Sequence, residues 1–241
     1  IGLILDSFHS LSRRVPSSSI GDIKADKLFF VQVADAPLLD MDYLSWSRHF
    51  RCMPGQGDFA LAEWAEAVHR IGYDGWWSLE IFNDRFRAGS ASGVAVDGYR
   101  SLQLMQDQVA RRARPIIQAE IPAPVSVKGV EFIEFAASND EASALGRMLG
   151  ALGFSAVGEH RSKDVTRWTQ GDINIVVNRE PEGFASSFDL VHGASVCAIG
   201  VRVSDVDGAL GRAKGLGIAR FEQAVGPDEL PLPGVRGVGG R

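Results

Sequence analysis

The stretch Gly72-Tyr-Asp-Gly-Trp-Trp-Ser-Leu-Glu-Ile-Phe-Asn-Asp84 combines a turn with a short apolar run that ends on one acid, Glu80. A run that follows Asp74-Gly75 and is rich in Trp and Leu predicts a buried parallel strand. Such strands open towards ligands at their carboxyl ends. The stretch therefore predicts an α/β fold with Glu80 at the ligand-binding edge of a sheet.

Two earlier apolar runs end in the same way. The run from Ile1 to Leu5 is followed by Asp6, and the run that begins at Leu28 is followed by Gln32 after Val31. Because the carboxyl ends of parallel strands meet at one edge, we expect these three oxygen ligands to converge. Two carboxylates and an amide oxygen suit hard divalent ions better than structural zinc. A single acid at a strand end can equally be a helix cap or a loop residue, so the metal prediction depends on all three.

Polar residues close to these strand ends add catalytic chemistry. His9 follows Asp6 in an Asp-x-x-His pattern, and an imidazole can act as a general base or acid near neutral pH. Arg51 lies four residues after Ser47, so in a helix the two share a face. The guanidinium of Arg51 could bind a substrate carboxylate through two parallel hydrogen bonds, or could be a surface group. The other four histidines have no neighbouring motif and are expected to be structural.

Composition and charge exclude several classes of protein. The chain has 241 residues, of which 45% are hydrophobic, and this is enough for a substantial core and two domains. The net charge of -5 argues against a nucleic-acid binder, and the apolar runs are too short for a membrane helix. With only Cys52 and Cys197, a disulfide framework is not expected. The default expectation is a cytoplasmic protein.

The first half of the chain alternates predicted strands and helices. Asp58 is expected to cap a helix from Phe59 to Ile71, and a longer helix is expected from Val94 to Arg112. On this second helix we expect Tyr99, Leu102, Met105 and Val109 to face inward. Strands that alternate with helices indicate a parallel sheet, but three β/α units are too few for a closed barrel. Because the sequence also begins without Met inside a strand, we expect an excerpt from a longer polypeptide.

The second half of the chain is predicted to be a different domain. The proline-containing segment 115–128 reads as a linker between domains at residues 1–114 and 129–241. Beyond it, the predicted order is strand, helix and three strands, and it starts again with a strand from Val196 to Val203. Leu145-Gly-Arg147 recurs 65 residues later as Leu210-Gly-Arg212. Self-similarity on this scale indicates a duplicated module, of which the second copy is incomplete.

Several motifs of the first half resemble a known group of metal-dependent barrels. They are Asp6-x-x-His9, Gln32 after an apolar strand, Arg51 before Pro54-Gly-Gln-Gly57, and Leu79-Glu80 after Gly72-Tyr-Asp-Gly75. Together they resemble the last three β/α units of the xylose-isomerase-like TIM barrels. This likeness implies a divalent cation such as Mg, Mn or Co on Asp6, Gln32 and Glu80. It implies a fourth ligand, a Glu at an earlier strand end, which has no counterpart in these residues.

Longer motifs from both halves are similar to one family of fusion proteins. Val31-Gln-Val-Ala-Asp-Ala-Pro37, Trp46-Ser-Arg-His-Phe-Arg51 and Leu79-Glu-Ile-Phe-Asn-Asp84 resemble the bacterial two-domain 3-dehydroshikimate dehydratases. In that family the barrel is fused to a domain similar to 4-hydroxyphenylpyruvate dioxygenase. His160-Arg-Ser-Lys-Asp-Val165 and Gln170-Gly-Asp-Ile-Asn174 resemble this second domain, which has the vicinal-oxygen-chelate fold.

The resemblance implies a lyase of quinate and shikimate catabolism that removes water from 3-dehydroshikimate to give protocatechuate. The cation would acidify the C–H next to the substrate ketone, and His9 would remove the proton. Arg51, with Ser47, would contact the substrate. Homo-oligomerisation stays open, and no nucleic acid or membrane is expected as a partner.

The resemblance also carries a negative expectation and leaves alternatives. Metal-bearing vicinal-oxygen-chelate modules usually place His early in the first strand, where this chain has Phe132 and Ala198. We therefore expect a structural or oligomerising second domain without a metal. One alternative is a sugar isomerase or epimerase on the same barrel, although these commonly have His in place of Gln32. The other is a binding or structural fragment without activity.

Overall fold

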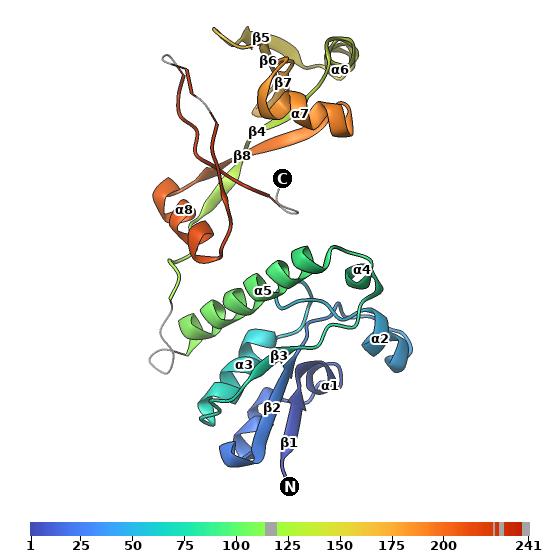
Figure 1. Cartoon of the computed structure of the whole chain (residues 1–241), viewed down its shortest axis with the longest axis vertical. Helices are drawn as coiled ribbons and strands as arrows, with labels where there is room; N and C mark the ends of the chain where they lie inside the picture. Colours follow the sequence, from blue (N-terminus) through green and yellow to red (C-terminus); the bar gives the residue numbers. More distant parts are fainter. Residues whose placement is uncertain (114–119, 224, 227–228, 238–241) are drawn as a thin grey trace. The chain divides into compact units, whose positions relative to one another are not determined.

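The computed structural model of the chain describes residues 1–113, 120–223, 225–226 and 229–237. These residues form two compact units, one of residues 1–123 with 210–241 and one of residues 124–209 (Figure 1). Residues 115–119 of the predicted linker 115–128 lie outside the described residues. The domain boundaries expected from the sequence stay a prediction.

Unit 1 is built on a three-stranded parallel sheet in the order β1-β2-β3. Its strands are β1 (Leu3–Asp6), β2 (Leu28–Val33) and β3 (Trp77–Leu79). Asp6 is in register with Gln32, and Gln32 with Ser78. Just beyond β3, the backbone N–H of Glu80 donates to the carbonyl of Val33 at 3.0 Å. The parallel register thus brings the three predicted ligands to one edge of the sheet, which confirms the α/β prediction.

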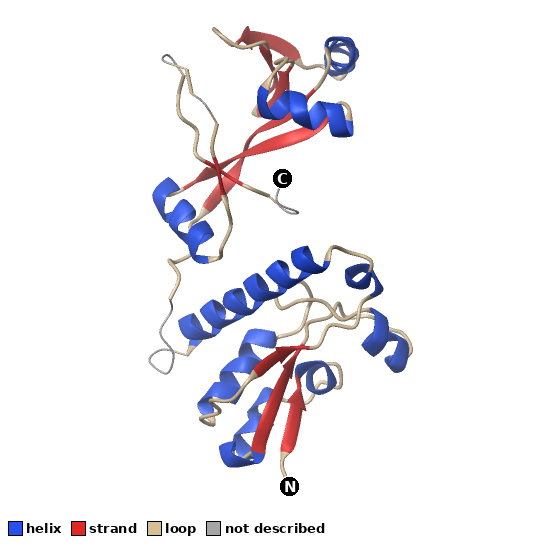
Figure 2. Ribbon diagram, in the orientation of Figure 1, coloured by secondary structure: helices blue, strands red, loops and turns tan. Residues whose placement is uncertain are grey.

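Among the described residues up to 123, five α-helices accompany this sheet, and Figure 2 shows helices and strands in different colours. They are α1 (Ser7–Leu11), α2 (Tyr43–His49), α3 (Leu61–Arg70), α4 (Asp84–Arg87) and α5 (Ala91–Arg112). The 3-10 helices η1 (Ser17–Asp22) and η2 (Ala25–Lys27) precede β2, and β9 (Arg220–Phe221) pairs with β10 (Gly234–Val235).

Two helix predictions were wrong in detail. The predicted cap Asp58 does not cap α3, because its carboxylate accepts the N–H of Leu38 and the helix starts at Leu61 after Ala60. Tyr99 does not face inward: it is 63% exposed. The buried stripe of α5 runs through Gly98, Ser101 and Met105, and Tyr99 lies one residue, about 100° of helix, beyond it.

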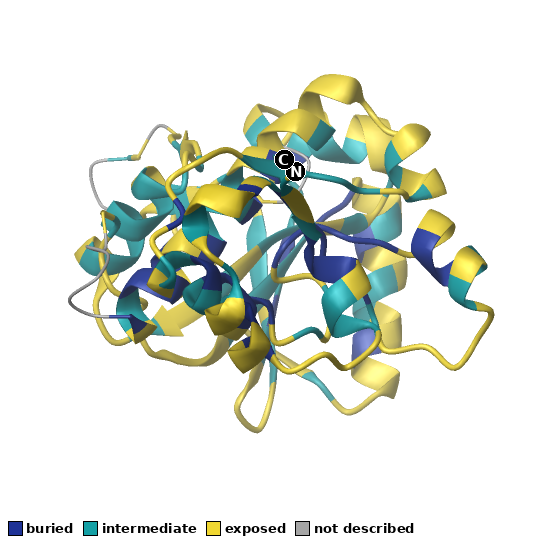
Figure 3. Cartoon of the chain, turned by 90° about the horizontal axis from the view of Figure 1, so that it is seen from below, coloured by how far each residue is buried: buried dark blue, intermediate teal, exposed yellow. Residues whose placement is uncertain are grey.

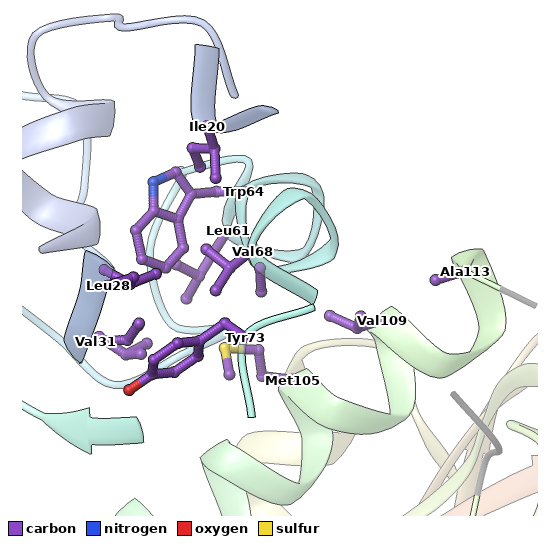
Figure 4. Close-up of a cluster of buried hydrophobic side chains, with 12 residues drawn as sticks. Ile20, Leu28, Val31, Leu61, Trp64, Val68, Tyr73, Met105, Val109 and Ala113 are labelled. Carbon is purple, nitrogen blue, oxygen red and sulfur yellow. The ribbon is translucent and has the colours of Figure 1, made fainter. Parts of the chain in front are cut away.

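The core of unit 1 packs α3 and α5 against β2 (Figure 4). Leu61, Trp64 and Val68 recur at the three- and four-residue spacing that places side chains on one face of α3. They meet side chains of β2 and α5, chiefly Val31, Val33, Met105 and Val109. This core holds β2 in place, and with it the position of Gln32 at the site edge.

Unit 2 contains a five-stranded sheet in the order β5-β6-β7-β4-β8. Its strands are β4 (Val127–Ala136), β5 (Ser155–Glu159), β6 (Val165–Gln170), β7 (Ile173–Asn178) and β8 (Ser195–Val203). With α6 (Asn139–Ala151) between β4 and β5, the predicted strand-helix-three-strand order is confirmed. The two strands that begin the predicted copies, β4 and β8, pair antiparallel with each other.

The helices of unit 2 differ in how far the sequence predicts them. Ser138 and Glu141 form a capping box that starts α6. The sequence pattern did not predict α7 (Gly183–His192), and α8 (Val206–Gly215) follows β8 across the boundary between the two units at Ala209. The unit core joins α6 to β4 and β7 through Leu149, Ile175 and Val177. In Figure 3 the helical ribbons carry exposed residues beside half-buried or buried ones. No helix among the described residues is long and apolar enough to cross a membrane.

Candidate active site

Arg51 lies at the centre of a polar cluster at the carboxyl edge of the unit 1 sheet. Its side chain is only 2% exposed, and its guanidinium lies over the rings of Phe8 and Phe82, at 4.6 and 5.1 Å from their centroids. Nη1 donates to Asp6 Oδ2 at 3.0 Å and to Glu80 Oε2 at 2.8 Å. One cationic nitrogen therefore bridges carboxylates from two strand ends.

Ser47 and His9 accept the remaining N–H groups of this guanidinium. Nε donates to the Ser47 carbonyl at 2.9 Å, and Nη2 donates to Ser47 Oγ at 3.1 Å. Nη2 also lies 3.4 Å from His9 Nε2. An arginine has five N–H groups, so all five of them have a partner here. Residue Arg51 is a buried hub of the cluster and not a surface group.

Asp6 serves two purposes with its two carboxylate oxygens. Oδ1 caps α1 by accepting the N–H groups of Phe8 and His9, at 2.7 and 3.4 Å. Oδ2 points into the cluster, 3.0 Å from Arg51 Nη1 and 3.6 Å from His9 Nε2. Asp6 is therefore both the helix cap and the site acid that the sequence offered as alternatives. The cap fixes the orientation of the oxygen that is left for the site.

Gln32 and Glu80 complete the edge. Gln32 Nε2 donates to Glu80 Oε1 at 2.8 Å, so both oxygens of the Glu80 carboxylate are engaged. Burial raises the pKa of Glu80, the neighbouring Asp6 carboxylate raises it further, and the positive charge of Arg51 opposes the rise. Two carboxylates held this close favour a positive group between them.

Two residues absent from the sequence prediction support the cluster from behind. Asp35 is buried and accepts the N–H groups of Gly55 and Phe59, at 3.0 and 3.1 Å, which holds the Pro54–Gly57 turn. Asn83 Nδ2 donates to the carbonyl of Arg51 at 2.9 Å. The position of Asp35 soon after Gln32 on the same strand end was the available signal, whereas Asn83 had none.

Tyr43 is a third residue of the cluster that the sequence motifs did not indicate. Its hydroxyl lies 2.7 Å from His9 Nδ1, and the two rings are tilted at 6.0 Å between centroids. The His9 side chain is half exposed, so Nδ1 is engaged by Tyr43 while Nε2 faces the cluster. The structure thus brings all six predicted residues together in one place: Asp6, His9, Gln32, Ser47, Arg51 and Glu80.

The donor set of this edge fits a hard divalent cation. The carboxylate oxygens of Asp6 and Glu80 already share one positive group, the Nη1 of Arg51. A rotation of the Gln32 side-chain amide by 180° exchanges its oxygen and nitrogen, which have nearly the same shape, and would present the oxygen to a cation. The described part of the chain holds no group of three or more His, Cys, Asp or Glu residues that could bind a metal ion, so a cation at this edge would need an oxygen from another residue type, such as Gln32.

The cysteines take no part in this chemistry. Both are free, and burial raises the pKa of Cys52 and of Cys197 to about 12. A thiol with such a pKa stays protonated near neutral pH and is a poor nucleophile. The cysteines are therefore not candidate nucleophiles, and the acids, the imidazole and the guanidinium are the candidate groups of the site.

The positions expected to lack a metal in unit 2 are built differently. Phe132 pairs with Gly200 and Ala198 with Glu134 across β4 and β8. The Phe132 ring lies so close over Gly200 that a Cβ there would be 2.3 Å from it. The expectation that no metal binds at this place stays a prediction.

Comparisons with known proteins match the two parts of the chain separately. Residues 1–105 match the family model "Xylose isomerase-like TIM barrel". Residues 121–241 match "Hydroxyphenylpyruvate dioxygenase, HPPD, N-terminal". These two ranges confirm the fold class predicted from the sequence, a barrel part followed by a dioxygenase-like part.

Similar proteins cover both parts at once. A 3-dehydroshikimate dehydratase of Pseudomonas aeruginosa is 47% identical over 100% of the chain, and one of Pseudomonas putida is 48% identical over 98%. The solved structure "xylose isomerase-like TIM barrel/4-hydroxyphenylpyruvate dioxygenase fusion protein" is 46% identical over 99% of the chain, with a TM-score of 0.88. The chain spans only 39%, 38% and 40% of the length of these three proteins.

Proposed function

Because the chain belongs to the family that fuses a xylose isomerase-like TIM barrel to a hydroxyphenylpyruvate dioxygenase-like domain, we propose that the full-length protein is a 3-dehydroshikimate dehydratase. It would remove water from 3-dehydroshikimate to form protocatechuate. One observation carries the proposal: two strand-end carboxylates and an imidazole surround Arg51, and the Gln32 amide is hydrogen-bonded to one of these carboxylates. The two dehydratases that match nearly the whole chain support the same substrate.

Asp6, Gln32 and Glu80 are the proposed ligands of a divalent cation. When bound, such a cation supplies a positive charge that polarises the substrate ketone and favours loss of a nearby proton. The Asp6 cap and the Gln32–Glu80 hydrogen bond hold these oxygens on three neighbouring strand ends before any ligand arrives. We leave the choice among Mg, Mn and Co to measurement.

His9 is the proposed base. Its Nε2 lies beside Asp6 Oδ2 and Arg51 Nη2, at the side of the cluster, and half of its side chain is open to solvent. An imidazole in this position can take a proton from a substrate carbon and pass it on to water. The substrate loses the proton from one carbon and hydroxide from another, and these combine as the one water that is released with protocatechuate.

Arg51 and Ser47 are the proposed substrate contacts. Because all five N–H groups of Arg51 are engaged, its fork reaches a substrate carboxylate only after some of them leave their present acceptors, and Nη1 would have to leave Asp6 and Glu80. These two carboxylates are also the ones that would hold the cation, so Nη1 and the cation would compete for the same oxygens. A structural or oligomerising second domain and a cytoplasmic location stay predictions.

The test is to incubate the full-length protein with 3-dehydroshikimate and Mn or Mg and to follow the ultraviolet absorbance of the aromatic product. We expect product from the wild type and a loss of at least about 1,000-fold for Glu80→Ala. Glu134→Ala, which changes a β4 acid hydrogen-bonded to Asn178, is the matched control and should retain activity. Absence of product from the wild type, or an unchanged rate for Glu80→Ala, would remove the proposal. Turnover of a ketose in the same assay would favour the isomerase alternative.

A further inference from the structure

The Arg51 guanidinium has one side that is anchored and one side that faces the proposed cation ligands. Nε and Nη2 donate to the carbonyl and the hydroxyl of Ser47, at 2.9 and 3.1 Å. The centre of the guanidinium lies over the rings of Phe8 and Phe82, at 4.6 and 5.1 Å from their centroids. None of these contacts involves an acid, so a cation at the sheet edge would leave them in place.

Nη1 is the nitrogen that holds both acids. It donates to Asp6 Oδ2 at 3.0 Å and to Glu80 Oε2 at 2.8 Å, and it lies 3.3 Å from the carbonyl oxygen of Glu80. The same two carboxylates are the proposed ligands of the divalent cation. A cation that takes both oxygens therefore has to replace two charge-assisted hydrogen bonds of Arg51.

The affinity of this edge for a cation should therefore depend on Arg51. The side chains of Arg51 and Asp6 are only 2% and 9% exposed, so salt and water screen their charges little. The contacts with Ser47 keep the guanidinium near the acids even when Nη1 has moved off them. Two positive charges at this range repel each other, so Arg51 should weaken the binding of a cation alone.

Nη1 needs another acceptor once the two acids bind a cation. A buried N–H group without a partner is costly, whereas a hydrogen bond between an arginine and a carboxylate is among the strongest. A carboxylate on the substrate could accept the N–H groups that Asp6 and Glu80 give up. Binding of that carboxylate would offset the displacement of Arg51, so the cation and the carboxylate would strengthen each other's binding by the same factor.

We propose that Arg51 couples the binding of the divalent cation to the binding of the substrate carboxylate. Its Nη1 holds Asp6 and Glu80 together when no cation is bound, and it donates to the substrate carboxylate when these acids hold one. This rests on the proposed function, in which Arg51 contacts the substrate. It adds that Arg51 lowers the affinity for the cation alone and raises it when a carboxylate ligand is present.

Two probe ligands that differ in one charge are suited to the test. Shikimate carries the ring carboxylate of the substrate but has no ketone, so it should bind without losing water. Methyl shikimate has the same ring and the same hydroxyl groups, and its ester is uncharged. Any contact between the hydroxyl groups and the cation is common to both ligands, so the difference between them reports on the carboxylate.

The first measurement uses the wild-type full-length protein and is independent of turnover. The dissociation constant of Mn is obtained from the electron paramagnetic resonance signal of free Mn, without a ligand and with each of the two ligands at saturation. We expect shikimate to strengthen Mn binding at least about 5-fold and methyl shikimate to have a clearly smaller effect. Equal effects of the two ligands would overturn the proposal.

The second measurement repeats this titration on Arg51→Met, which keeps most of the side-chain length and removes the charge. We expect Mn alone to bind at least about 10-fold more tightly than in the wild type, and the advantage of shikimate over methyl shikimate to disappear. A purely structural Arg51 predicts the opposite, weaker Mn binding, because the two ligands would lose their positions. Weaker or unchanged Mn binding by folded Arg51→Met would therefore contradict the coupling.

The control is an arginine that also pairs with a buried acid. Arg111 donates to Asp107 at 2.6 Å, one turn away on α5, and Arg111→Met should leave both the Mn affinity and the shikimate effect unchanged. If Arg51→Met does not fold, the wild-type comparison of the two ligands decides the proposal. If the wild type binds no Mn at all, the proposed cation site fails and the coupling with it. If Mn binds without the coupling, only this inference fails, and the dehydration assay still decides the function.

Discussion

The sheet edge of unit 1 and the sheet of unit 2 place charged residues in opposite ways. In unit 1, Arg51 is 2% exposed and lies between two carboxylates from separate strand ends. In unit 2, Arg202 pairs with Glu131 on neighbouring strands, and their side chains are 66% and 45% exposed. Buried charges are costly unless each one is matched, whereas exposed pairs contribute little. A buried cluster of matched charges that adds little net stability is the arrangement expected of a functional site.

The parallel arrangement explains why only one unit concentrates its charges. In unit 1 the strands run the same way, so the residues just after them meet at one edge. In unit 2 most neighbouring strands run antiparallel, and residues at consecutive strand ends separate to opposite edges. An acid after an apolar run therefore predicts a shared site more reliably in the first half of the chain than in the second.

The largest difference between the two units is expected when each arginine is replaced by alanine. We expect Arg51→Ala to lower the free energy of unfolding by about 3 to 5 kcal/mol, because Oδ2 of the buried Asp6 and Oε2 of the half-buried Glu80 lose the cation between them. Arg202→Ala should cost less than about 1 kcal/mol. Calorimetry on the full-length protein measures both, and Mn should restore part of the loss in Arg51→Ala only. Equal effects of the two substitutions would mean that Arg51 is not a hub.

A smaller difference is expected in how the stability of unit 1 depends on pH. Burial lowers the pKa of His69, which stacks on Trp77 in unit 1 at 4.9 Å. The unfolded chain then binds a proton more readily than the folded one. The stability of unit 1 should therefore fall as the pH drops from about 6.5 towards the lower folded pKa, and level off below it.

The matching variants test the origin of this pH dependence. His69→Phe should flatten the decrease in the melting temperature between pH 7 and pH 5. His160→Gln, at an exposed position of unit 2, should leave it unchanged. An identical pH profile for the wild type and His69→Phe would assign the dependence to other groups.

The sequence predicted the elements of the site better than their connections. Asp6, Gln32 and Glu80 were predictable because strand period and turn signals are local, and parallel register does the rest. The contact of Tyr43 with His9 joins residues 34 apart, and that of Asn83 with Arg51 joins residues 32 apart. Such contacts depend on how loops settle on the sheet, which no local pattern encodes.

The sequence also did not predict which groups the Arg51 guanidinium contacts. The spacing to Ser47 predicted that the two would meet, and the structure confirms it. That spacing does not tell whether the guanidinium points to a substrate or to the carboxylates of its own chain. Likewise, the helical pattern placed Met105 and Val109 correctly but not Tyr99, since one residue of phase separates core from solvent.

The most direct test of the shared site is an anomalous-scattering map from crystals of the full-length protein grown with Mn. The account predicts one Mn peak with oxygens of Asp6, Gln32 and Glu80 at about 2.0 to 2.4 Å, and Arg51 Nη1 moved off the two carboxylates. It also predicts no peak beside Phe132 or Ala198. A map with Mn bound elsewhere in the barrel, and Arg51 still bridging Asp6 and Glu80, would contradict it.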